Sequence, residues 1–336
     1  MTDKTSRAVW FTGPRRIELR EAPVLPPGAG EIVVEATRSL ISAGTEMLVY
    51  RGDTTPGDRM PPTSEGRFPF PAKYGYQIVG RVVEAGADSG YAVGDRVFAR
   101  HPHQDVFTIA ALPTLVTAIP DAVSDDAATL LNLTRVALTG VLDVPVKTGE
   151  VAVVFGQGIV GMMCARIARL NAGKVIVVDR LAKRRELALA YGADAAVEPQ
   201  DVAATVAGLS DGRGADVVYE ASGAPPALQS AIEIAADRGE VVAISLYGKQ
   251  EVSLRLAPEF HFRRLRITSS QATDQPRWDW VRRTEVSFDL LQRLDTTEMI
   301  SATVPFDRAA EAYDLVDGDP AHVLGVVLDY GPPRSA

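Results

Sequence analysis

The 336-residue sequence is poor in cysteine and in histidine, and this shortage restricts its chemistry. Cys164 is the only cysteine, so the chain can form no internal disulfide and no structural zinc site built from cysteines. Basic residues are also in the minority, 35 against 43 acidic ones, which leaves a net charge of −8. Proteins that bind nucleic acids cluster Lys and Arg against the phosphates, so this balance argues against a nucleic-acid partner.

Long hydrophobic runs and low-complexity tracts are missing as well. A membrane-spanning helix needs about 20 apolar residues, and the polar segment Met1–Arg7 is unlike a signal peptide, so we expect a soluble, cytoplasmic protein with a small-molecule substrate. Hydrophobic residues make up 46% of the chain and charged residues 23%, a balance typical of a chain that folds throughout. Single cores stop growing at about 250–300 residues, so the length predicts two domains.

Two different rhythms follow each other along the chain. From Arg7 to about Ile119, short β-type runs are broken by Gly and Pro, which predicts a β-rich domain. A helical stretch at about Asp125–Val141 leads into apolar strands that alternate with amphipathic helices, the pattern of βαβ units and a parallel sheet. These strands are predicted at Val151–Phe155, Val175–Asp179, Val217–Glu220 and Glu240–Leu246. The tail, Ala302–Tyr330, returns to short strands around one helix and could rejoin the first domain. We therefore predict domains at 1–122, 123–297 and 298–336.

A glycine-rich turn follows the first strand of the second domain. Gly156, Gly158 and Gly161 form a GxGxxG motif between a buried strand and an apolar helix, Met162–Leu170. In a dinucleotide-binding loop the first glycine permits the tight turn, the second lets the backbone approach the pyrophosphate, and the third allows close packing of helix on strand. The free N–H groups at the helix N-terminus attract the anion. The motif predicts a cofactor site made by Gly156, Gln157, Gly158, Ile159, Val160 and Gly161.

Asp179 ends the next strand, about 20 residues beyond this motif, where a carboxylate accepts hydrogen bonds from the adenosine ribose. The same negative charge would repel a 2′-phosphate, so we expect NAD in preference to NADP. Arg180, Lys183, Arg184 and Arg185 follow, and two of them could reach a 2′-phosphate; we interpret this run as the solvated first turn of a helix, with Arg180 beside the cofactor. Cys164, on the apolar face of the first helix, is interpreted as a buried hydrophobic residue.

The order of these parts resembles the medium-chain dehydrogenase/reductase superfamily over nearly the whole chain. Segments similar to family landmarks stand at Pro27–Glu31, Gly94–Val97 and Glu220–Gly223, and Ile41–Glu46 resembles a zinc-less branch that includes bacteriochlorophyllide dehydrogenases. A closer likeness, to uncharacterised bacterial dehydrogenases, lies in Phe68–Tyr76, His101–Asp105 and Ser269–Gln271. The resemblance implies an α/β fold in which a GroES-like β-rich catalytic domain carries an inserted Rossmann domain and takes back the tail. It also places Ser222 at the cofactor.

The resemblance implies as well that zinc is absent. The family's alcohol dehydrogenases hold their catalytic zinc at three positions, which on this chain correspond to Ala43, Tyr76 and about Asn132. Alanine and tyrosine are not usual zinc ligands, and the loop that carries four cysteines in zinc-containing members has none here. Gln77 replaces an acid that usually lies near the metal. We therefore expect neither a structural nor a catalytic zinc ion.

Without zinc, hydrogen-bond donors must stabilise the substrate oxygen. By the resemblance, Thr45 matches the hydroxyl residue that contacts this oxygen, and Tyr76 stands where a ligand histidine would be. His101 falls where family members line the substrate pocket, and an imidazole is suited to acid/base chemistry near neutral pH. These three residues are the predicted catalytic groups, and both hydroxyl residues should face the nicotinamide. For Glu46 we expect a partner in Lys73, Arg96 or a backbone donor.

The sequence therefore predicts an NAD(H)-dependent, zinc-independent oxidoreductase acting on a secondary alcohol or ketone, with a polar, polyol- or sugar-like substrate. One alternative is an NADPH-dependent enoyl or quinone reductase, against which Asp179 weighs. A second alternative is a nucleotide-binding protein without turnover, because a fold does not establish a function. Arg277, Trp278 and Trp280 form a basic and aromatic cluster that closes over substrate or lies in a dimer interface; we favour the interface, and thus a homodimer.

Overall fold

The computed structural model describes residues 5–54 and 64–332, and the chain divides into two compact units. One unit comprises residues 1–132 and 280–336, and the other comprises residues 133–279. The helix α2 (Asp125–Thr129) packs on strands of the first unit and on α9 (Trp280–Arg293), so residues 123–132 and 280–297 belong to that unit rather than to the sheet of the second. The predicted domain boundaries, which lie near 122 and 297, stay a prediction.

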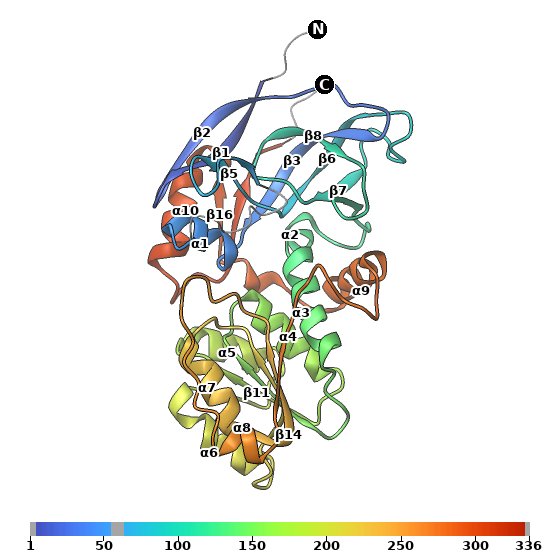
Figure 1. Cartoon of the computed structure of the whole chain (residues 1–336). Coiled ribbons are helices and arrows are strands. Elements are labelled where there is room, and N and C mark those ends of the chain that lie inside the picture. Colours follow the sequence, from blue (N-terminus) through green and yellow to red (C-terminus); the bar gives the residue numbers. More distant parts are fainter. Residues whose placement is uncertain (1–4, 55–63, 333–336) are drawn as a thin grey trace. The chain divides into compact units, whose positions relative to one another are not determined.

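The first unit is built on a seven-stranded sheet with the order β16-β17-β3-β6-β7-β9, in which β8 also pairs with β3 (Figure 1). All of its pairs are antiparallel except β16 with β17. The strands are β3 (Glu31–Ile41), β6 (Ile78–Ala85), β7 (Arg96–Ala99), β8 (Val106–Ala110), β9 (Val116–Ala118), β16 (Ala302–Pro305) and β17 (Val326–Asp329). Because β17 pairs with β3, the C-terminal tail completes the sheet that the N-terminal segment begins.

A second, four-stranded sheet in this unit has the order β2-β1-β5-β4. Its strands are β1 (Thr5–Gly13), β2 (Arg16–Pro23), β4 (Glu65–Gly66) and β5 (Ala72–Lys73). The helices α1 (Thr45–Arg51) and α10 (Ala309–Gly318) contact each other, and a 3-10 turn (Phe306–Arg308) precedes α10, while another (Thr297–Met299) follows α9. Alternate residues of the large sheet, among them Ile32, Val34, Ile78 and Phe107, are buried in one apolar core, as the period-2 pattern of a strand requires.

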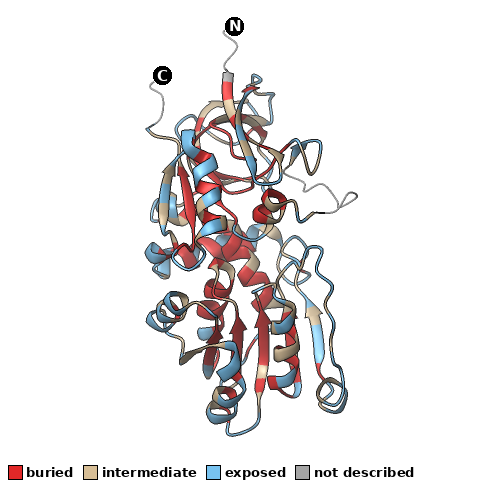
Figure 2. Cartoon of the chain, turned by 90° about the vertical axis from the view of Figure 1, so that its left-hand side faces the viewer, coloured by how far each residue is buried: buried red, intermediate tan, exposed pale blue. Residues whose placement is uncertain are grey.

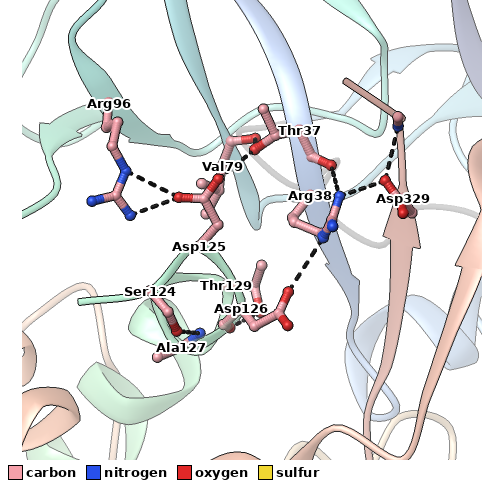
Figure 3. Close-up of polar contacts among 11 residues, drawn as sticks. Thr37, Arg38, Val79, Arg96, Ser124, Asp125, Asp126, Ala127, Thr129 and Asp329 are labelled. Carbon is pink, nitrogen blue, oxygen red and sulfur yellow. Dashed lines mark hydrogen bonds and ion pairs between the residues drawn. The ribbon is translucent and has the colours of Figure 1, made fainter. Parts of the chain in front are cut away.

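Ion pairs fasten α2 and the last strand to this sheet (Figure 3). Arg96, at the start of β7, donates to Asp125 at 2.6 and 3.0 Å, and the Thr37 hydroxyl donates to the same carboxylate at 3.0 Å. Arg38 pairs with Asp126 at 3.3 Å and also with Asp329 of β17. Both acids of α2 lie in its first turn, where a negative charge is also favoured by the helix dipole.

The second unit holds a six-stranded, wholly parallel sheet with the order β12-β11-β10-β13-β14-β15. The strands are β10 (Val151–Phe155), β11 (Lys174–Val178), β12 (Ala195–Val197), β13 (Ala215–Glu220), β14 (Ala235–Ala243) and β15 (Arg266–Ser269). The helices are α3 (Leu131–Asp143), α4 (Ile159–Arg169), α5 (Ala182–Ala190), α6 (Val202–Leu209), α7 (Pro225–Ile234) and α8 (Glu259–Phe262), with a 3-10 turn at Pro199–Asp201. Figure 2 shows buried strands flanked by helices whose outer sides are exposed, as a doubly wound sheet requires.

Three elements differ from their predicted form or bounds by more than two residues. The stretch predicted as one helix at about Asp125–Val141 is two helices, because Leu130 closes a tight turn on Ala127. The helix predicted from Met162 begins at Ile159, since Gly158 is its N-cap. The strand predicted at Glu240–Leu246 runs from Ala235 to Ala243 instead. Within residues 5–54 and 64–332, the structure contains no helix with the length and apolar character needed to cross a membrane.

Candidate active site

The glycines of the loop between β10 and α4 are required for three different reasons. Gly156 has φ +81°, and a Cβ there would lie 2.6 Å from Cα of Ser222. A Cβ on Gly161 would lie 1.7 Å from the carbonyl oxygen of Gly156, so any larger residue would push the helix away from the strand. Around Gly158, in contrast, no atom of the described residues beyond its immediate chain neighbours lies within 4 Å of the missing Cβ. That open space at a helix N-terminus fits a pyrophosphate group approaching the backbone.

Asp179 holds this loop to the end of β11. Its carboxylate accepts a hydrogen bond from the backbone N–H of Gln157 at 2.7 Å and another from that of Leu181 at 2.9 Å. The residue is half-buried, so part of the carboxylate remains accessible to a ligand. The carboxylate of Asp179 is therefore held in place by two backbone donors, and its role at the cofactor ribose stays a prediction.

The basic run after Asp179 is partly engaged within the protein. The Arg185 guanidinium donates to the carbonyl oxygens of Asp179 and Arg180, each at 2.9 Å, and pairs with Glu198 at 2.9 Å. Burial lowers the pKa of Arg184, and the nearby charge of Asp179 offsets part of this effect. Arg180 itself is exposed. Arg185 is thus committed to backbone oxygens and a carboxylate, which opposes its use as a 2′-phosphate ligand.

The other predicted loop residues, Gln157, Ile159 and Val160, differ in how far their side chains are buried. Gln157 is fully buried, and its side-chain amide donates to the carbonyl oxygens of Val154 and Gly156, each at 3.2 Å, so its side chain supports the loop from within. Ile159 is buried in the first turn of α4, while Val160 is half-buried. Only their backbone groups are therefore suited to bind a phosphate.

Glu220 at the end of β13 organises a second turn in this unit. The buried carboxylate accepts hydrogen bonds from the backbone and hydroxyl of Ser222, from the backbone of Gly223 and from the Tyr247 hydroxyl, the last at 2.6 Å. Ser222, predicted at the cofactor, is exposed but donates its hydroxyl to Glu220. The anchoring role of Glu220 and Tyr247 was not predicted, since the sequence singles out the motif but not the partners of its acid.

Thr45 and Tyr76 belong to a small group of hydroxyls in the first unit. The Tyr76 hydroxyl donates to Ser42 at 2.6 Å, and Thr45, at the first position of α1, is near enough to contribute a hydrogen bond to the phenol. Burial is the main cause that raises the pKa of Tyr76 to about 12, followed by the charge of Glu46. The phenol is therefore protonated at neutral pH and can donate a hydrogen bond. The sequence singled out Thr45 and Tyr76 but not Ser42, the acceptor of the phenol's hydrogen bond.

His101 stacks on Phe107, with ring centroids 3.8 Å apart. Its Nδ1 lies 2.8 Å from the carbonyl oxygen of Pro102, which requires Nδ1 to carry the proton and leaves Nε2 as an acceptor. Burial lowers the pKa of His101 to about 3. At neutral pH the imidazole is then uncharged and has no proton to give from Nε2. The predicted acid/base role stays a prediction that this environment opposes, whereas a role as hydrogen-bond acceptor agrees with it.

Glu46 is buried in the first unit and accepts three hydrogen bonds. The donors are the backbone N–H of Ser42 at 3.1 Å, Nε2 of His103 at 2.9 Å and the Tyr313 hydroxyl at 2.8 Å. On the other side of the His103 ring, Nδ1 lies 2.7 Å from the Ser39 hydroxyl. The expectation of a backbone partner was correct.

The two cations considered for Glu46 have other partners. Lys73 lies 2.6 Å from Glu65 and donates to Gln104 at 3.1 Å, while Arg96 binds Asp125. The pairing of Glu46 with Lys73 or Arg96 was therefore wrong, because the sheet register places these cations beside nearer acceptors.

The residues at the family's zinc positions offer no suitable set of ligands. Ala43 has no donor atom, and Tyr76 carries a protonated phenol bonded to Ser42. Gln77 is fully buried and donates to the carbonyl oxygen of Leu40 at 3.3 Å. Among residues 5–54 and 64–332, no three His, Cys, Asp or Glu side chains lie together in a group that could hold a metal ion. The side chains at this site do not fit a catalytic zinc.

Comparison with known proteins identifies the relatives of the chain. A family model described as zinc-binding dehydrogenase matches residues 159–287. The D-guloside 3-dehydrogenase of Shigella flexneri is 33% identical over 251 residues, which cover 71% of this chain and 72% of that protein. The chain belongs to the zinc-binding dehydrogenase family. Another relative is the 2-desacetyl-2-hydroxyethyl bacteriochlorophyllide A dehydrogenase of Cereibacter sphaeroides. It is 31% identical over 349 residues, which cover 96% of this chain and 98% of that protein.

Solved structures confirm the predicted fold class of this dehydrogenase-family member. Zinc dependent alcohol dehydrogenase 2 from Streptococcus pneumonia superimposes with a TM-score of 0.82 at 20% sequence identity, covering 98% of this chain and 100% of its own. The GroES-like unit with an inserted Rossmann sheet is therefore the architecture, as the resemblance implied. The family's name refers to zinc, whereas this member lacks donor atoms at Ala43 and has a phenol at Tyr76.

Proposed function

We propose that the protein is an NAD(H)-dependent, zinc-independent oxidoreductase that interconverts a secondary alcohol and a ketone. The observation that carries the proposal is the glycine loop, in which Gly158 leaves open space at the N-terminus of α4 while Asp179 fixes the loop backbone. Bound there, the cofactor would supply the acceptor or donor of the hydride.

A preference for NAD(H) follows from the charge at the ribose position. The half-buried carboxylate of Asp179 is held by two backbone donors and cannot turn away without leaving both unpaired. A 2′-phosphate beside it would add like charge in a partly desolvated place. Arg185, which could otherwise offset that charge, is bonded to backbone oxygens and Glu198.

The hydroxyl group of Tyr76 is proposed to handle the substrate oxygen, together with Ser42 and Thr45. In the direction of ketone reduction, the phenol would donate a hydrogen bond to the oxygen as the arriving hydride gives it negative charge, and the resulting alkoxide would take its proton from water. In the direction of alcohol oxidation, the phenol oxygen would accept the hydrogen bond of the alcohol while it donates to Ser42, and the alcohol proton would pass to water as the hydride leaves. A pair of hydroxyls can serve both directions because each can reverse its role as donor and acceptor. One positioned donor of this kind contributes roughly 3–4 kcal/mol to the transition state.

A polar, polyol- or sugar-like substrate is supported by the relative from Shigella flexneri, which is named as a dehydrogenase of a guloside. The test is to incubate the purified protein with NAD⁺ or NADP⁺ and a panel of polyols, glycosides and simple secondary alcohols, and in parallel with NADH or NADPH and a panel of ketones and enones. We expect turnover of a polar secondary alcohol with NAD⁺ at a higher kcat/KM than with NADP⁺. Reduction of enones alone, with NADPH preferred, would contradict the proposal and favour an enoyl reductase.

A further inference from the structure

Arg100 lies in the first unit, near the backbone of Tyr76, and no carboxylate pairs with it in the described part of the chain. It directly follows β7, which pairs with β6 so that Ala99 lies opposite Ile78. Continued by one residue, this antiparallel register places Arg100 opposite Gln77, the neighbour of Tyr76. The two residues also influence each other electrostatically, since the charge of Arg100 lowers the pKa of Tyr76.

The guanidinium is held by one carbonyl and one aromatic ring. Nη1 donates to the carbonyl oxygen of Thr114 at 3.2 Å, and the guanidinium carbon lies 4.9 Å from the ring centroid of Trp280. Nε is buried and has no hydrogen-bond partner in the described part of the chain. Over that same part, no carboxylate lies within ion-pair distance of Arg100. Arg96, four residues earlier on β7, shows the contrast, because it binds Asp125 through two nitrogens.

Such an environment is unfavourable for a cation unless a ligand completes it. Arg100 is half-buried, and this burial lowers its pKa, although a guanidinium remains charged at neutral pH. A desolvated charge and a buried N–H without a partner both destabilise the folded state. An anion would relieve both, and the planar fork of arginine matches a carboxylate in particular.

We propose that Arg100 binds a carboxylate of the substrate, which makes the substrate a hydroxy acid of the aldonate or uronate type rather than a neutral polyol. The inference rests on the proposed function, since it names the substrate class of the same site. A monoanionic carboxylate is favoured over a phosphate dianion because one guanidinium balances one negative charge. The substrate's secondary alcohol would then bind at Tyr76 while its acid group binds at Arg100.

Equilibrium binding tests this assignment without requiring turnover. D-gluconate and D-glucitol, which differ at the acid group, are titrated by calorimetry into the protein saturated with NADH. We expect gluconate to bind more tightly than glucitol. Arg100→Met should weaken gluconate binding by roughly 10- to 150-fold and leave glucitol unchanged. Arg16→Met, which removes the same charge from an exposed position on β2, should change neither. Equal binding of the two ligands, or equal losses in Arg100→Met, would overturn the proposal.

A second variant guards against misfolding of the first. Arg100→Lys keeps the charge but loses the planar fork, so gluconate affinity should fall to a value between those of the wild type and Arg100→Met. If the lysine variant melts like the wild type and binds gluconate equally well, a bidentate carboxylate site is refuted. Failure of the proposed function looks different, because gluconate would then bind through Arg100 while neither aldonates nor polyols reduce NAD⁺.

Discussion

Replacing Asp179 with Asn should lower both the stability of the protein and its preference for NAD(H), because the carboxylate holds two backbone donors and carries the charge that disfavours a 2′-phosphate. The carboxylate accepts from the backbone of Gln157 at 2.7 Å and from that of Leu181 at 2.9 Å. An amide offers one acceptor oxygen and points its NH₂ group at the other backbone donor, so at least one N–H loses its partner. The loss of one charge-assisted bond and the unpaired donor should lower the free energy of unfolding by about 1–3 kcal/mol.

The same variant should discriminate less between the two cofactors. Removing the negative charge abolishes its repulsion of a 2′-phosphate, and a change of about 1.4 kcal/mol corresponds to a tenfold shift in the ratio of the two dissociation constants. Urea unfolding and fluorescence titration with NADH and NADPH measure both quantities. Asp237→Asn, at an exposed position of β14, is the control with the same change of charge. An Asp179→Asn protein as stable and as selective as this control would refute the reasoning.

Three further predictions concern single groups. Tyr76→Phe should lower kcat/KM by roughly 10²–10³ with little change in NADH affinity, and an unchanged kcat/KM in steady-state assays would remove the phenol from the mechanism. Gly158→Ala should raise the Kd of NADH at least about tenfold with little loss of stability. Gly161→Ala should instead destabilise the protein by about 1–3 kcal/mol, because its Cβ would lie 1.7 Å from a backbone oxygen. Equal losses of stability in the thermal melts of the two variants would contradict this. Burial lowers the pKa of His101 to about 3, so between about pH 6.5 and pH 3 the unfolded chain binds a proton that the folded chain does not. The free energy of unfolding should therefore decrease by about 1.4 kcal/mol for each unit by which the pH is lowered through this range. His101→Asn should flatten this pH dependence in urea unfolding curves.

The cofactor loop could be predicted from the sequence because its determinants are local. A buried strand, three glycines at fixed spacing and an apolar helix stand within about 20 residues, and each glycine is required by contacts to its own neighbours. Asp179 follows the next strand, and parallel strands bring their carboxyl ends to one edge of the sheet. Sequence pattern and structure therefore agree most closely here.

The hydroxyl and carboxylate network of the first unit could not be predicted in the same way. Glu46 bonds to His103, 57 residues away, and to Tyr313, 267 residues away. Strand alternation predicts which residues share a face, but the partner across the sheet depends on register and on the order of strands. The lack of a carboxylate partner for Arg100 in the described part of the chain could not be predicted for the same reason, because it depends on which acids the fold brings near this side chain.

The most direct test of hydride transfer without zinc combines metal analysis with turnover on one preparation. The protein is purified without added metal, its zinc content is measured, and the rate of NADH formation with the best secondary alcohol is compared before and after dialysis against a chelator. The residues at Ala43 and Tyr76 predict substoichiometric zinc and an unchanged rate. Zinc bound at one equivalent per chain, with activity lost on chelation and restored by zinc, would contradict the account.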